Sequence, residues 1–93
     1  MSTMGNMMER DPQELKNQIT QIVAKIARID AGELQDHVRI REELGIDSLM
    51  SMEIIARLEK ALGIRIDETL FADVQTVDDF NKLIIELTWR KST

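Results

Sequence analysis

The sequence predicts an all-α fold, a four-helix bundle of three longer helices and one short helix. Three stretches of the chain carry apolar residues at helical spacing, and each follows a residue that favours the start of a helix. No stretch shows the alternation of apolar and polar residues that is typical of a half-buried strand. With 93 residues, the chain can form one small domain around a single core, and it is too small for a roomy enzyme cleft.

The composition narrows the classes of function. Apolar residues make up 43% and charged residues 31%, a balance typical of a globular protein. The formal net charge of -5 argues against binding to nucleic acid and favours a partner with a basic docking surface. The chain has no cysteine, which excludes disulfides and thiolate metal sites and fits a cytoplasmic location. No metal site is expected. The apolar runs are far shorter than the roughly 20 residues that span a bilayer, and no membrane association is expected.

The first helix is predicted to begin with Asp11 as N-cap and Pro12 in the first helical position. It should end at residues 30–32. Residues 1–10 are expected to form a flexible segment; in the alternative interpretation, their methionines dock on the domain. The apolar stripe of this helix consists of Leu15, Ile19, Ile22, Val23, Ile26 and Ile29.

A long connection with no regular period follows at residues 31–46. Its apolar residues are separated by charged ones, which predicts a loop held down by inserted side chains. Gly45 supplies a turn just before the next helix. A connection of this length is uncommon in so small a domain and often has a function. The apolar residues in question are Val38, Ile40, Leu44 and Ile46.

The second helix is predicted over residues 48–62, and Gly63 should cap its C-terminal end. A short helical turn is expected at residues 68–71. The last helix should begin after Thr76 as N-cap, with two acidic residues in its first turn and its buried face formed by Val77, Phe80, Leu83, Ile84 and Leu87.

The last helix also carries a second apolar line, because Ile85 and Trp89 lie four residues apart and off the buried stripe. Two interpretations remain open. The pair either covers the first helix or the N-terminal segment, or it forms a face for docking or self-association. Residues 91–93 should form a C-terminal tail.

The second helix places apolar residues on two opposite faces. At about 100° per residue, Ile55, Leu58 and Leu62 share the core side, with Ile54 and Ala61 at its edge. Leu49, Met52 and Ala56 form an outward strip beside the charged residues Glu53, Arg57 and Lys60. Single exposed apolar residues are common, but a strip aligned with a helix N-terminus also fits a docking surface.

The stretch LGIDSLMSMEIIARLEKALGI resembles the acyl or peptidyl carrier protein family. The family signature is Asp-Ser-Leu after a leucine-glycine turn at the start of the second helix, which corresponds here to residues 44–49. The order of elements supports the resemblance over about residues 12–88, and the carrier domain is expected at residues 11–90. The resemblance implies a bundle like that of acyl carrier proteins, with 4'-phosphopantetheine from coenzyme A attached to Ser48.

In that family, the attached arm ends in a thiol that holds acyl intermediates as thioesters. The resemblance implies that Leu49, Met52 and Ala56 meet partner enzymes, with Glu53 at the border of this docking surface. It also implies that Asp47 helps a phosphopantetheinyl transferase to bind metal and cofactor, besides capping the helix. A phosphodiester at Ser48 would lie at a helix N-terminus, where free N–H groups and the helix dipole favour negative charge. The other partners implied are an acyltransferase or ligase and a ketosynthase.

The sequence gives no indication that Ser48 is a catalytic residue. A nucleophilic serine needs a nearby base oriented by a third group, and His37, the one histidine, lies in the long loop. His37 is expected to be a surface or packing residue, and Ser51 should face the core. The protein is therefore predicted to be a monomeric carrier and not an enzyme.

The sequence also departs from the family pattern. Fatty-acid carriers usually have a strongly acidic second helix, whereas the charges of the second helix cancel here. The runs DSLMS and LEKALGI are more similar to carriers of polyketide or mixed polyketide–peptide biosynthesis. Three alternatives remain: a fatty-acid carrier, an unmodified helical interaction module, and a helix-turn-helix DNA binder, which the acidic charge disfavours. The sequence does not decide whether the chain is free-standing or part of a larger synthase. It also does not decide whether the core of the bundle opens to enclose the acyl chain.

Overall fold

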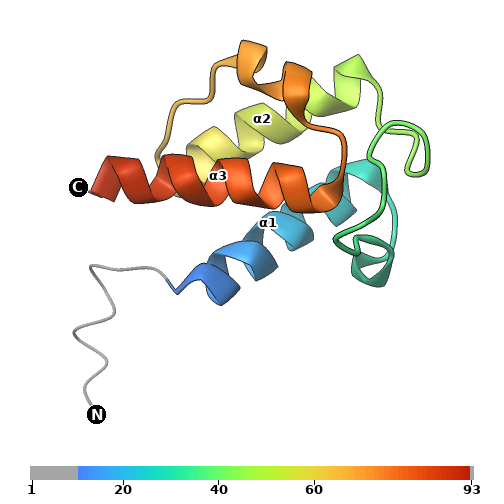
Figure 1. The fold of residues 1–93 in the computed structure, drawn as a ribbon, viewed down its shortest axis with the longest axis horizontal. Coiled ribbons are helices and arrows are strands. Elements are labelled where there is room, and N and C mark those ends of the chain that lie inside the picture. The colour runs from blue at the N-terminus through green and yellow to red at the C-terminus, as the bar shows by residue number, and fades with distance from the viewer. Residues whose placement is uncertain (1–10, 93) are drawn as a thin grey trace.

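The computed structural model describes residues 11–92, with side chains as far as Arg90. It contains the helices α1 (Pro12–Ala27), α2 (Ser48–Leu62) and α3 (Val77–Ser92), and the short 3-10 helices η2 (Ala31–Glu33) and η3 (Glu68–Asp73). Figure 1 shows the three long helices stacked on one another, with α3 in the foreground and the connection from η2 to α2 at one end. The predicted all-α fold is confirmed: three helices are long, and η3 is the predicted short one.

Helix α1 begins as predicted but ends earlier than expected. The Asp11 side chain accepts a hydrogen bond from Gln13 N at 3.3 Å, and Pro12 is the first helical residue. The helix stops at Ala27, not at residues 30–32, because Arg28 adopts the left-handed conformation with φ 60°. The N–H groups of Arg28 and Ile29 both donate to the carbonyl of Ala24, which closes the helix.

The long connection is held by side chains, as predicted, and also by backbone hydrogen bonds. Ile46 is buried, while Val38, Ile40 and Leu44 are partly buried against the core. Ile40 N donates to Gln75 O at 2.9 Å, and Val77 N donates to Val38 O at 2.9 Å. These bonds tie the connection to the start of α3, so its path is determined by a segment far away in the sequence.

Helix α2 has the predicted bounds, and Gly63 closes it in the left-handed conformation with φ 67°. Ala61 was expected at the edge of the core side, but it is exposed. Ile54 on the same flank is buried and lines a small cavity together with Ile40, Ile46 and Phe71. Ala61 lies about two turns further along the helix, away from these residues. The buried residues of α2 are Ile54, Ile55, Leu58 and Leu62.

Helix α3 begins with a reciprocal cap. Asp79 N donates to Thr76 Oγ1 at 3.1 Å, and Asp79 Oδ2 accepts from Gln75 N and Thr76 N. This confirms Thr76 as N-cap. The helix continues to Ser92, two residues into the predicted C-terminal tail; the division of the chain into residues 1–10, 11–90 and 91–93 stays a prediction.

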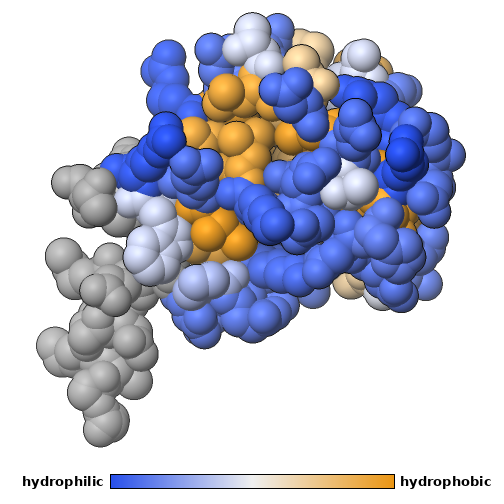
Figure 2. All heavy atoms as spheres, in the orientation of Figure 1, coloured by the Kyte–Doolittle hydropathy of each residue, from blue (hydrophilic) through white to orange (hydrophobic). Residues whose placement is uncertain are grey.

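The core joins the three helices and the segments between them. Its most deeply buried side chains are Leu15, Ile19, Leu58 and Ile84, one or two from each helix. Ile85 packs partly against this core, but 44% of Trp89 is exposed. On the face shown in Figure 2, hydrophobic residues reach the surface beside the C-terminal half of α3, with hydrophilic residues around them. The methionines at positions 4, 7 and 8 lie outside the described residues, so docking of that segment is untested.

Candidate functional site

Ser48 lies at the exposed tip of α2, and the residue before it fixes this position. Asp47 has an extended backbone, and its Oδ1 accepts a hydrogen bond from Met50 N at 2.9 Å. The carbonyl of Asp47 accepts the first helical hydrogen bond, from Ser51 N at 2.9 Å. Asp47 is therefore the N-cap of α2. Gly45, in the left-handed conformation with φ 69°, turns the chain into this cap.

The tip of α2 offers a free hydroxyl and free N–H groups. The Ser48 side chain is exposed, and no hydrogen bond to another described residue engages it. The N–H groups of Ser48 and Leu49 precede the first helical hydrogen bonds, so they remain open to an anion. His37 is exposed in the connection and has no contact that would activate Ser48 as a nucleophile. The tip can hold a phosphate ester, and within residues 11–90 nothing turns it into a catalytic site.

The predicted outward strip on α2 is exposed. Leu49 is 75% and Met52 58% exposed, and both Ala56 and the charged Glu53 also face solvent. Leu49 and Met52 are two of the four large hydrophobic residues exposed in the described part of the chain. The structure therefore brings together Ser48 and the four residues predicted to dock partners. The docking role itself stays a prediction.

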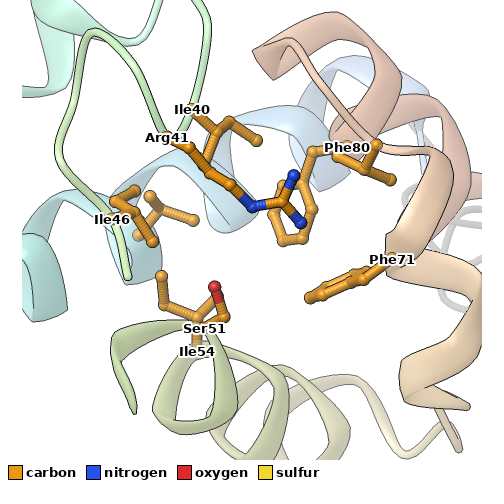
Figure 3. Close-up of a pocket in the computed structure, with 9 residues that line it drawn as sticks. Ile40, Arg41, Ile46, Ser51, Ile54, Phe71 and Phe80 are labelled. Carbon is orange, nitrogen blue, oxygen red and sulfur yellow. The ribbon is translucent and has the colours of Figure 1, made fainter. Parts of the chain in front are cut away.

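A small cavity opens one turn beyond Ser48, under the long connection. It has a volume of about 30 Å³ and lies between α1, α2, the connection, η3 and α3. Figure 3 shows the hydroxyl of Ser51 and the guanidinium of Arg41 pointing toward its centre, between Phe71 and Phe80. Ser51 is half-buried, which agrees with its predicted orientation toward the core.

Arg41 and Phe71 were not predicted to line this cavity. Arg41 lies in a run of charged residues, which is typical of a solvated loop. Its side chain lies over the cavity because of the path that the connection takes in the folded protein, and the local sequence does not indicate that path. Asn81 was missed as well, although a signal was present. It lies four residues after Val77 and three before Ile84, a spacing that places it on the buried face of α3.

The chain also matches known proteins. Residues 17–84 match the model of the family described as "Phosphopantetheine attachment site". The chain is 30% identical over 83 residues to an acyl carrier protein of Saccharopolyspora erythraea, covering 89% of this chain and 87% of that protein. It is 33% identical over 69 residues to polyketide-8 synthase acyl carrier protein 2 of Streptomyces avermitilis, covering 74% of this chain and 79% of the relative.

A third similarity is to a much larger protein, non-reducing polyketide synthase 1 of Elsinoe fawcettii. It is 41% identical over 64 residues, which cover 69% of this chain and 3% of the synthase. The matches over most of the chain define its family: the protein belongs to the acyl carrier proteins. Its cofactor is phosphopantetheine, and its role is that of a carrier and not of a catalyst.

Proposed function

We propose that Ser48 carries 4'-phosphopantetheine, and that the protein presents acyl intermediates to enzymes of polyketide or mixed polyketide–peptide biosynthesis. One observation carries the assignment of the residue. Ser48 is an exposed serine at a capped helix tip, inside the matched segment and next to the exposed Leu49 and Met52. Ser51, on the same helix, is half-buried and lines a cavity, so it is a poor alternative.

The residues at the tip of α2 fit the group. The phosphate would meet the open N–H groups of Ser48 and Leu49 and the positive end of the helix dipole. Asp47 has its carboxylate engaged by Met50 N, which holds the tip in place; in the proposal it also helps the transferase to bind metal and cofactor. When bound, the group supplies a thiol on a flexible arm, so the absence of cysteine from the chain is no obstacle to carrying a thioester.

The charges of α2 support a polyketide carrier over a fatty-acid carrier. Of its two acidic residues, Glu59 is half-buried, and its carboxylate accepts a hydrogen bond from Ile66 N at 2.8 Å. Glu53 is then the one fully exposed acid of α2, beside the exposed Arg57 and Lys60. The exposed surface of α2 therefore gives little support to the idea that partner enzymes recognise this protein by an acidic helix. Two of the relatives are themselves named as polyketide synthase proteins.

The proposed partners are a phosphopantetheinyl transferase, an acyltransferase or ligase that loads the arm, and a ketosynthase that draws on it. They would dock on the strip formed by Leu49, Met52 and Ala56, with Glu53 at its border. Cytoplasmic location and a monomeric state stay predictions. Within the part of the chain that the structure describes, no helix is long and apolar enough to cross a membrane.

Intact-mass measurement tests the attachment. The purified protein is incubated with coenzyme A and a broad-specificity phosphopantetheinyl transferase, beside Ser48→Ala and Ser51→Ala. We expect the mass of one phosphopantetheine to be added to the wild type and to Ser51→Ala, and none to Ser48→Ala. Modification of Ser48→Ala would show that the arm is attached to another residue. If the folded wild type is not modified, the result would favour the alternative that the protein is an unmodified helical interaction module. The pathway is tested by comparing rates of chain extension with ketosynthases of polyketide and of fatty-acid synthesis.

A further inference from the structure

Trp89 is a large aromatic side chain that lies open on α3. It is 44% exposed, and Ile85, about one turn earlier, packs only partly against the core. Figure 2 shows hydrophobic surface beside the C-terminal half of α3. The exposed residues Leu49 and Met52 belong to the strip proposed for partner docking, at the start of α2. The start of α2 lies at the other end of the molecule (Figure 1), so the face formed by Ile85 and Trp89 needs an explanation of its own.

The first turn of α1 lies level with Trp89. The two helices run in opposite directions, and the start of α1 and the end of α3 lie at the same end of the molecule (Figure 1). Thr20 of α1 and Asn81 of α3 line the same small cavity. Pro12 comes eight residues before Thr20, and Trp89 comes eight residues after Asn81. Because both helices rise by about 1.5 Å per residue, Pro12 and Trp89 are brought to the same level.

Trp89 also lies on the flank of α3 that faces α1. Asp78, Ile85 and Trp89 follow one line along α3, because they are spaced by seven and four residues. At the start of this line, Asp36 connects the two helices. Its carboxylate pairs with Lys16 of α1 at 3.0 Å, and its carbonyl accepts a hydrogen bond from Asp78 N at 3.0 Å. The residues that precede α1 therefore join it beside the open face of Trp89.

The start of α1 turns the preceding chain off the helix axis. Pro12 disfavours a helical conformation of the residue before it, and Asp11 is extended, with φ -61° and ψ 130°. Helix α1 therefore does not continue beyond this point along its own axis. Met8 comes three residues before Asp11 and Met4 comes seven before it, so the chain can span at most ~11 Å and ~25 Å from Asp11 to these residues. Both spans suffice to reach a side chain that lies level with Pro12.

The segment before α1 has the composition to cover an aromatic side chain. Four of the six methionines of the chain fall in residues 1–10. Met4, Met7 and Met8 are spaced so that one helical turn would present all three on the same side. Methionine adapts to irregular apolar surfaces, and its thioether makes favourable contacts with the ring edge of an aromatic residue. These side chains therefore match the face formed by Ile85 and Trp89.

We propose that the segment before α1 folds back across the line of contact between α1 and α3, and that Met4, Met7 and Met8 cover Ile85 and Trp89. The contact is within one chain. It leaves the tip of α2 open to partner enzymes, because that tip lies at the other end of the molecule (Figure 1). The inference does not depend on attachment of phosphopantetheine at Ser48, and it is tested on the unmodified protein.

Fluorescence of Trp89 gives the first readout, since the chain has a single tryptophan. Acrylamide quenching is measured on the full chain and on a variant with Met4→Ser, Met7→Ser and Met8→Ser. Because the indole would regain most of its accessible area in this variant, we expect its quenching constant to be about twofold larger and its emission to move to longer wavelength. The matched control replaces the same three methionines by leucine, which conserves the apolar volume and should keep the wild-type values. Equal quenching of the wild type and the serine variant would overturn the inference.

Nuclear Overhauser contacts give the second readout, with the full chain labelled at the methionine methyl groups with ¹³C. We expect contacts from at least one of Met4, Met7 and Met8 to the indole of Trp89, and none from Met52, which is exposed near the start of α2 and serves as the internal control. The contacts should be unchanged on dilution. If they weaken on dilution, a second copy of the chain covers Trp89 and the inference is wrong. It is also wrong if none of the three methyl groups contacts the indole.

Discussion

At the scale of single residues, Asp47 combines two roles that can be separated. Its side chain accepts from Met50 N and holds Ser48 at the tip of α2, and its carboxylate charge is available to a modifying enzyme. The structural role needs only an acceptor oxygen, because asparagine caps helices about as well as aspartate. The proposed role toward the transferase needs the negative charge. Asp47→Ala therefore tests the role of the cap in stability, and Asp47→Asn tests the role of the negative charge in modification.

We predict that Asp47→Ala lowers the free energy of unfolding by about 1 kcal/mol, because α2 loses its cap. Asp47→Asn should keep nearly all of the stability, yet slow phosphopantetheine attachment. Urea unfolding followed by circular dichroism measures the first effect, and the initial rate of mass gain measures the second. If Asp47→Asn is modified at the wild-type rate, Asp47 is a cap and nothing more.

We make an unusual prediction for the core residue Asn81: its replacement should stabilise the protein, because its Nδ2 is buried without a hydrogen-bond partner among the described residues. Asn81→Leu removes an unsatisfied buried donor and places apolar atoms beside a small void, so the free energy of unfolding should rise by about 1 kcal/mol. Thermal and urea unfolding of the unmodified protein measure this change. A loss of more than about 1 kcal/mol would mean that the amide has a structural partner or that leucine is too large for the site.

At the scale of elements, the end of α1 depends on a residue that tolerates its backbone poorly. Arg28 has φ 60°, a conformation that costs a side-chain-bearing residue about 1 kcal/mol and glycine very little. Arg28→Gly should therefore stabilise the protein by roughly 0.5–1 kcal/mol. Gly45→Ala is the matched opposite, because Gly45 has φ 69° and a Cβ there would meet no atom within 4 Å. It should destabilise through backbone strain alone, and urea unfolding of both variants compares the two effects.

The cap of α3 gives the fold a defined response to acid. Hydrogen bonds from Gln75 N and Thr76 N to the Asp79 carboxylate lower its pKa below the ordinary value of 3.8. Since the folded pKa is the lower one, this contribution is fully present above the unfolded pKa and is lost as the pH falls through the folded value. Stability should decline below about pH 4, and more weakly in Asp79→Asn. Parallel acid slopes of wild type and variant in urea unfolding would show that other carboxylates dominate.

The elements that the sequence predicts best are those with local signals. Asp47 and Gly63 bracket α2, and Thr76 with Asp79 starts α3, because caps depend on hydrogen bonds within three or four residues. The end of α1 was missed because the left-handed turn falls on an arginine, which composition does not reveal. The pairing of Ile40 with Gln75 and the position of Arg41 over the cavity depend on contacts between distant segments, and no local pattern encodes them.

At the scale of the whole molecule, the apolar strip beside Ser48 stands out against a chain of net charge -5. Leu49 and Met52 project from the same helix that carries the proposed attachment site, and neither contributes to the core. Their substitution therefore separates docking from folding. A small number of exposed apolar residues commonly carries most of the energy of such an interface.

We predict that Met52→Glu lowers the rate of acyl transfer to a partner ketosynthase by about tenfold, equivalent to ~1.4 kcal/mol of docking. Thermal stability should stay unchanged, because the side chain already faces solvent. Ala61→Glu is the matched control, since it adds the same charge to an exposed position on another flank of α2. Transfer rates are measured with carriers loaded to equal extent at Ser48. If Ala61→Glu slows transfer as much as Met52→Glu, the added charge alone is responsible, and the strip has no special part in docking. If neither variant slows transfer, partner enzymes approach the arm from a different face of the protein.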